Sequence, residues 1–279
     1  MKLKLFTILL ILFISCKNET RTNSNYNDFY KKKIIELNIH FENVYEYEFR
    51  FGQPDEKTKF LVEHSEYDKN GNLIKKGIYY SNKNLAEYEF VHTFSYDDKG
   101  NHIETIEKNL KGEVKSIDKY KIEKGLITES VEYNPNGEIT NKTIFKYDNY
   151  GNWIEVVFYD ESGKIKSKRT RKFNDRNEEI EQISYNKDGE IESIRRLVEL
   201  KDGWKKYQIF NEKNELESEY LFVENENGGI IESIWKNIKE NSENKTITEF
   251  DENGLELKIT KFENNGEPQI LKIIERVKY

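Results

Sequence analysis

The chain has 279 residues and carries 45 lysines and arginines against 52 aspartates and glutamates, a formal net charge of −7. Hydrophobic residues make up 35% of it, which is low for a globular chain of this length, whereas 18 tyrosines and 16 phenylalanines are too many for a disordered chain. The acidic balance and the absence of a basic block argue against nucleic acid as a partner.

Residues 1–15 have the pattern of a signal peptide. Two lysines precede an apolar run, Leu5–Ile14, which is too short to span a bilayer. The run ends in Leu12-Phe13-Ile14-Ser15-Cys16, which resembles a bacterial lipobox. The resemblance implies cleavage before Cys16 and lipidation of its thiol and new amine, and several acyl chains give a stable membrane anchor. A secreted protein with a chance cysteine is the alternative.

The residues after the cysteine are expected to form a tether. Residues 16–32 would be the lipidated Cys16 and a polar linker, and residues 33–279 a repeat domain. A short helix over residues 28–37 is an additional option. Since no Asp follows Cys16, the mark of inner-membrane retention in some gram-negative bacteria, we expect a lipid-anchored envelope protein of the outer membrane. Its domain would lie on the periplasmic face or the cell surface.

One motif recurs through the rest of the chain: an aromatic residue, Asp or Asn, two variable positions, and Gly or Asn. Its aromatic residues at positions 133, 147, 159, 173 and 185 are 14, 12, 14 and 12 residues apart, so one unit has about 13 residues. The clearest signature residues are Tyr67, Asp68, Gly71, Tyr96, Asp97, Gly100, Tyr133, Gly137, Tyr147, Asp148, Gly151, Tyr159, Asp160, Gly163, Tyr185, Gly189, Phe250, Asp251 and Gly254.

The motif predicts β-hairpins. Asp suits the first position of a type I turn and Gly the left-handed position that follows, which is a three-residue hairpin loop with a bulge. Between turns, apolar and charged residues alternate with period two, as they do from Tyr45 to Phe49. We therefore expect an all-β antiparallel meander of sixteen to eighteen strands. Because open twisted sheets rarely exceed about ten strands, this open sheet should twist or curl.

The Tyr-Asp-x-x-Gly-Asn turns at residues 67–73, 96–101 and 147–153 resemble the YD repeats of the RHS family. They are also similar to the MORN-type repeats of YwqK-like proteins described as antitoxins. In RHS proteins such repeats build a spiral β-shell around a C-terminal toxin. This chain departs from that pattern, because it has fewer repeats, no toxin domain after them and a lipid anchor. The resemblance therefore implies a hairpin repeat and little about activity.

Motifs for catalysis are not found in the sequence. It contains no phosphate loop, nucleophile elbow or Ser/His/Asp motif, and its four histidines lack metal-ligand spacing. The donors of Asp68–Asn72 are explained by the turn rather than by a calcium loop. Three tryptophans are expected to pack within the repeats, with a sugar-binding platform as the alternative: Trp153, Trp204 and Trp235. We thus predict no enzyme, no metal and no cofactor.

Three functions remain open. The first is a membrane-anchored, non-catalytic module that binds a protein or a polysaccharide. The second is an immunity or antitoxin-like protein, which the RHS and YwqK resemblance implies. The third is a carbohydrate-active hydrolase, which would need two carboxylates in a concave pocket. An open sheet has free edges, so an edge-to-edge homodimer is also expected.

Overall fold

The structure is a computed structural model that describes residues 25–80, 89–201, 203–264 and 266–279. One α-helix, one short 3-10 helix and nineteen strands lie within these ranges. They follow in the order α1 (Asn25–Glu36), β1 (Ile39–Arg50), β2 (Gln53–Pro54), η1 (Glu56–Thr58), β3 (Phe60–Tyr67), β4 (Leu73–Ile78), β5 (Phe90–Tyr96), β6 (His102–Asn109), β7 (Val114–Glu123), β8 (Leu126–Tyr133), β9 (Ile139–Tyr147), β10 (Trp153–Tyr159), β11 (Ile165–Phe173), β12 (Glu179–Tyr185), β13 (Ile191–Lys201), β14 (Trp204–Asn211), β15 (Leu216–Glu224), β16 (Ile230–Asn237), β17 (Ser242–Phe250), β18 (Glu256–Phe262) and β19 (Pro268–Lys278).

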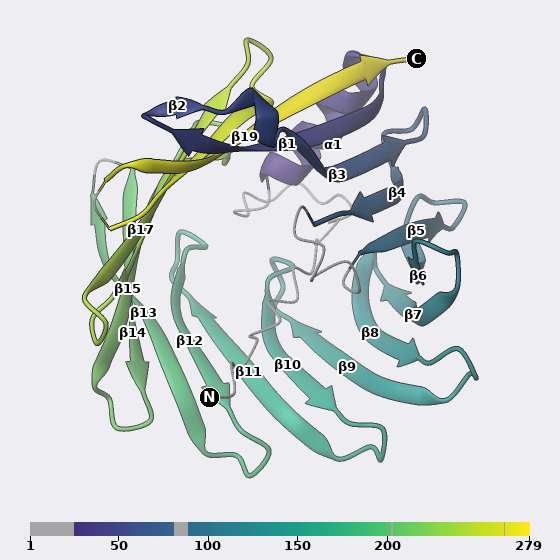
Figure 1. Cartoon of the computed structure of the whole chain (residues 1–279). Coiled ribbons are helices and arrows are strands. Elements are labelled where there is room, and N and C mark those ends of the chain that lie inside the picture. Colours follow the sequence, from purple (N-terminus) through teal and green to yellow (C-terminus); the bar gives the residue numbers. More distant parts are fainter. Residues whose placement is uncertain (1–24, 81–88, 202, 265) are drawn as a thin grey trace.

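The strands form a closed barrel (Figure 1). From β3 to β19 each strand pairs antiparallel with the next, and β1 pairs with β3 on one side and β19 on the other. The seam between β1 and β19 runs in register from Ile39↔Lys278 to Glu48↔Ile270. Within the described residues β2 pairs only with the end of β1, which leaves eighteen strands in the ring. The all-β meander was expected, but the prediction of an open sheet was wrong.

The closure of the ring depends on the whole sheet and cannot be predicted from a local turn motif. Each hairpin specifies only its own two strands, and the twist accumulated over many strands decides whether the first and last strands meet. Here they meet, and pairing satisfies the backbone donors and acceptors that free edges would expose. The expected edge-to-edge homodimer presupposed free edges, and the ring of β1 and β3–β19 has none.

The turns have the geometry that the motif indicates. In the turn after β10 the backbone N–H of Gly163 donates to Asp160 O at 3.0 Å, and Asp160 N–H donates to Lys164 O at 2.9 Å. The Asp160 carboxylate accepts from the N–H groups of Ser162 and Lys164, both at 2.9 Å. Gly163 has a φ of 76°, and Asn replaces Gly at this position in Asn177 and Asn214, with φ of 63° and 62°. Asp or Asn and Gly thus fix locally each hairpin that carries the motif.

Successive turns lie at opposite ends of the barrel, since the strands alternate in direction. We call the end with the turns after odd-numbered strands the helix end, because α1 packs there, and the other the far end. Phe29 lies so close to Gly254 that an added Cβ would be 2.9 Å from the ring, and Ile35 lies against Gly71 in the same way. The side chains of Ile34, Ile39, Tyr67 and Leu255 form a buried cluster around this contact.

Helix α1 begins earlier than the option over residues 28–37. It spans Asn25–Glu36 and so crosses the expected boundary between the tether and the repeat domain at residues 32 and 33. Its apolar residues pack against turns of the barrel. This contact stabilises a helix that is too short to be stable in isolation. Cys16 and the expected signal peptide lie outside the described residues.

Candidate functional site

The outer wall of the barrel is charged. Cross-strand ion pairs join outward positions of neighbouring strands, for example Lys146 and Glu155 at 2.6 Å and Lys172 and Glu181 at 2.8 Å. Further pairs of this kind are Lys75–Glu66, Lys206–Glu219, Lys245–Glu232 and Lys258–Glu249. Membrane-spanning barrels carry an apolar outer band, and each Lys or Arg at the bilayer midplane costs them about 2–4 kcal/mol. This wall is therefore suited to water.

The inner wall surrounds a cavity of about 660 Å³, bordered by strands from β4 to β11. Its lining mixes charged, polar and aromatic side chains, in contrast to the apolar filling of a small barrel. Its charged and aromatic members include Lys76, His92, Glu107, Asp118, Glu132, Arg169, Phe94, Tyr120, Phe145 and Phe158. Rings beside charged groups are the composition of a ligand site rather than of a core.

One side of the lumen is acidic. Asp118 of β7 faces Glu132 of β8 in register, and both line the cavity. Burial raises the pKa of Asp118 to about 6, and the nearby charges of Glu132 and Glu107 add to the effect. Glu107 is 3.1 Å from the Nε2 atom of His92, and Glu132 accepts a hydrogen bond from Asn141. This side therefore has a carboxyl group that changes charge close to neutral pH.

Another part of the inner wall, on strands β11 to β13, is basic. Arg171 of β11 and Arg195 of β13 both contact the carboxylate of Glu179, with Arg171 Nε 3.2 Å from Glu179 Oε2. The guanidinium of Arg171 lies 3.5 Å from the ring centroid of Trp153, a cation–π contact. Arg169, two residues before Arg171 on the same face, lies 5.5 Å from the Phe158 ring centroid. Among the described residues, Glu179 is thus the carboxylate partner of two of these three guanidinium groups, and Arg169 has none within ion-pair distance.

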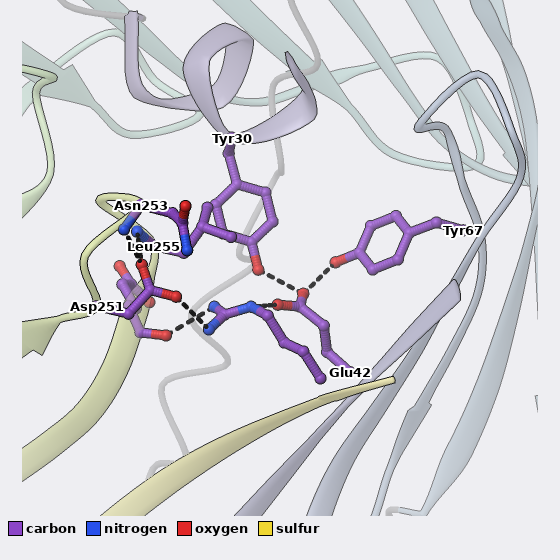
Figure 2. A network of polar contacts seen from close by, with 8 residues as sticks. Tyr30, Glu42, Tyr67, Asp251, Asn253 and Leu255 are labelled. Carbon is purple, nitrogen blue, oxygen red and sulfur yellow. Dashed lines mark hydrogen bonds and ion pairs between the residues drawn. The ribbon is translucent and has the colours of Figure 1, made fainter. Parts of the chain in front are cut away.

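A third polar cluster fastens the helix to the seam (Figure 2). Glu42 of β1 accepts hydrogen bonds from the hydroxyls of Tyr30 and Tyr67, the latter at 2.6 Å, and from Arg276 Nε at 2.5 Å. Arg276 Nη1 also lies 3.7 Å from Asp251. Burial raises the pKa of Tyr30 and Tyr67 well above the usual value, so both stay neutral donors. Since every group is satisfied, we assign this cluster to stability rather than to binding.

The signature residues of the sequence motif are not brought together. Their turns alternate between the helix end (Tyr67, Tyr96, Tyr147, Phe250) and the far end (Tyr133, Tyr159, Tyr185). Trp153 lies under Arg171, and Trp235 lies 6.4 Å from Tyr220, ring centroid to centroid, across β16 and β15. The charged lumen residues were not among the site residues predicted from the sequence. A pattern in the sequence could have indicated them: polar side chains occupy alternate positions of a strand, as in Ser116, Asp118 and Tyr120, on the face where a filled barrel core needs apolar residues.

Two kinds of site find no support in the part of the chain that the structure describes. No group of three or more His, Cys, Asp or Glu side chains there is arranged to hold a metal ion. No helix in residues 25–80, 89–201, 203–264 and 266–279 is both long enough and apolar enough to cross a membrane.

Comparisons with known proteins give likenesses of overall shape. A porin-like protein from Bacteroides uniformis ATCC 8492 is 10% identical over 86% of this chain and 96% of its own, with a TM-score of 0.44. One from Bacteroides vulgatus ATCC 8482 is 9% identical over 85% and 98%, with a TM-score of 0.36. TcdB2-TccC3 without its hypervariable C-terminal region is 12% identical over 83% of this chain but only 18% of its own length, with a TM-score of 0.21.

No protein-family model and no curated protein matches the chain. The solved structures have TM-scores below 0.5 and identities of 9–12%, so neither a shared fold nor a shared function follows from them. The strand pairing of the chain itself therefore carries the description as a barrel.

Proposed function

We propose that this chain is a lipid-anchored, non-catalytic binding protein of the bacterial cell envelope that takes its ligand into the barrel lumen. The observation that carries the proposal is the cavity of about 660 Å³, whose lining combines ionisable groups with aromatic rings. A ligand in such a lumen is surrounded by hydrogen-bonding groups and flat apolar faces, which together give orientation and affinity.

The proposal assigns membrane attachment and binding to different parts of the chain. The lipobox-like segment ending at Cys16 would supply attachment, and the barrel, with its ion-paired outer wall, would stand in water. A Cys16→Ser variant tests the anchor. Wild-type protein should incorporate labelled fatty acid and sediment with membranes, whereas the variant should do neither. Labelled fatty acid in the variant would overturn the lipid assignment to Cys16.

Binding inside the lumen is tested by filling it. Ser130 of β8 lines the cavity, and its chain neighbour Val131 lies on the opposite face of the same strand. Ser130→Trp should block the lumen, and Val131→Trp is the matched outer variant. The detergent-extracted lipoprotein is heated with oligosaccharides and peptides of the envelope, because a bound ligand raises the unfolding temperature.

We expect a ligand-induced rise in unfolding temperature for wild type and Val131→Trp, and none for Ser130→Trp. A rise that survives in Ser130→Trp and disappears in Val131→Trp would instead assign binding to the outer wall. The absence of a rise with every probe would also count against the proposal. The unfolding temperature without ligand shows whether each variant folds.

A further inference from the structure

We infer that Arg169, Arg171 and Arg195 form an anion-binding site on the lumen wall, which takes the carboxylate, sulfate or phosphate group of an acidic saccharide. The inference rests on the proposed function, since it names the class of ligand that the lumen would bind. The site lies on strands β11 to β13, and β11 is three strands along the sheet from β8, which carries Glu132 of the acidic side.

The strand register brings the three arginines onto one face. Arg171 pairs with Gln182 of β12, and Gln182 pairs with Arg195 of β13. The two arginines therefore stand on either side of one strand, roughly 10 Å apart along the sheet. Arg169 follows on the same face of β11 and borders the cavity. The side chains of Arg171 and Arg195 are 25% and 31% exposed, so they can be reached from the lumen.

The arginines carry more positive charge than their surroundings compensate. Glu179 is the carboxylate that contacts Arg171 and Arg195, and Arg169 has no carboxylate within ion-pair distance among the described residues. The Nε atom of Arg195 is buried and has no hydrogen-bond partner in the part of the chain that the structure describes. An unsatisfied buried donor is costly, and a bound oxyanion would supply its acceptor.

The environment of Arg171 also indicates that a bound anion would stabilise the arginine cluster. Burial lowers the pKa of Arg171 to about 10; Glu179 acts against this, and the positive charges of Arg195 and Arg169 add to it. Positive charges held this close repel one another in the absence of an anion. Guanidinium groups bind planar or tetrahedral oxyanions through paired N–H donors, which is why arginine suits carboxylate and phosphate groups.

Aromatic rings beside the arginines indicate that the anion belongs to a saccharide. Trp153 and Tyr207 lie under the guanidinium groups of Arg171 and Arg195. Tyr207 stacks on Phe222 at 6.0 Å with 3° between their planes, and Tyr220 lies 5.2 Å from Phe222, ring centroid to centroid. Tyr207 itself is buried, so the partly exposed rings of Tyr220 and Phe222 are the apolar faces that suit a sugar ring carrying an acidic substituent.

The experiment measures binding of short saccharides to the detergent-extracted lipoprotein by calorimetry. The probes are an oligogalacturonate with carboxylates, a sulfated oligosaccharide, a phosphorylated one, and an uncharged oligosaccharide of equal length. Arg195→Gln removes a member of the site, and Arg196→Gln is the matched control, since Arg196 faces outward and pairs with Glu181 at 3.2 Å. Arg169→Gln is a second site variant that breaks no ion pair of the described residues, so its folding is not at risk.

We expect at least one acidic probe to bind wild type, with affinity reduced about tenfold or more in Arg195→Gln and Arg169→Gln and unchanged in Arg196→Gln. Its identity tells carboxylate, sulfate and phosphate apart. Equal affinity for acidic and uncharged probes, or an equal loss in Arg196→Gln, would overturn the anion site while leaving lumen binding intact. If no probe binds, and the Ser130→Trp test is also negative, the proposed function fails as well.

Discussion

Glu42 of β1 and Arg276 of β19 face each other in register across the seam that closes the barrel, with Arg276 Nε 2.5 Å from Glu42 Oε1. Their side chains are 6% and 12% exposed. The other carboxylate oxygen of Glu42 accepts from Tyr30 of α1 and Tyr67 of β3. One carboxylate thus joins the helix to β1 and to both strand neighbours of β1.

Removing the charge of Glu42 should destabilise the barrel strongly. In Glu42→Gln the buried guanidinium of Arg276 keeps, among the residues that the structure describes, only Asp251 as an acidic ion-pair partner, at 3.7 Å. Removing one partner of a buried ion pair lowers the free energy of unfolding by about 3–5 kcal/mol, because the other charge stays buried without its partner. Urea unfolding of wild type and variant measures the difference.

The matched control lies on the outside of the same seam. Glu275 of β19 pairs with Lys59 at 3.1 Å, and both side chains are well exposed. Glu275→Gln should therefore lower the free energy of unfolding by at most about 1 kcal/mol. Equal losses in the two variants would show that the buried network has no special role in closing the ring.

The Asp118 carboxyl should make the folded protein less stable as the pH rises through about 6, which is the reverse of the usual effect of a carboxyl group. Its pKa in the folded protein, about 6, lies above the ordinary value of 3.8, so the folded protein holds this proton more tightly than the unfolded chain does. The contribution of Asp118 is therefore favourable at low pH and is lost as the pH rises through about 6. Asp118→Asn should be more stable than wild type at neutral pH, with a difference that shrinks toward pH 4.

Urea unfolding of both proteins across this pH range checks the prediction, because the difference between them cancels the other carboxylates. A constant difference at all pH values would contradict it. Asn also keeps nearly the size of Asp, so the cavity volume stays the same and the charge alone is varied.

The left-handed turn position at Gly163 should tolerate Asn better than Ala. An added Cβ meets no atom within 4 Å, so only backbone strain at a φ of 76° opposes a substitution. Gly163→Ala should cost about 1 kcal/mol and Gly163→Asn clearly less, as Asn177 and Asn214 already show at equivalent turns. Thermal unfolding of the two variants gives the order. An Asn variant less stable than the Ala variant would rule out strain as the cause.

The hydroxyl of Tyr147 should contribute to joining the neighbouring strands β8 and β9. It donates to the carbonyl of Ile127 in β8 at 2.7 Å, from the last residue of β9. Tyr147→Phe should lower the free energy of unfolding by about 0.5–1.5 kcal/mol, because the hydrogen bond is lost with little change in packing. Tyr133→Phe is the control, since the contact described for Tyr133 is that of its ring with Lys119. Chemical denaturation distinguishes the two.

How far the sequence predicts this fold depends on the range of the interactions. Asp160 and Gly163 determine a hairpin through contacts within five residues, so the strands and their antiparallel order could be read directly. Glu42 and Arg276 are separated by most of the chain. Neither of the two segments has a sequence pattern that indicates which strand it pairs with. The closed ring was therefore missed, and the resemblance to YD repeats stays a prediction about the repeat.

The candidate site was missed for a related reason. Arg171 and Arg195 are two among many charged residues in strands where charged and apolar residues alternate, and charge on one face is the ordinary mark of solvent. Only closure turns one of the two faces inward and encloses its polar residues. Trp153, for which packing and a sugar-binding platform were both open, lies beneath the guanidinium of Arg171.

The seam also bears on how the chain is made. Every strand from β4 to β18 pairs with its immediate neighbours in the sequence, whereas the second edge of β1 stays unpaired until β19, Pro268–Lys278, has been made. Until then the growing sheet has two unpaired edges, which other chains can extend. Loss of the last strand would therefore turn a self-contained ring into a template for assembly.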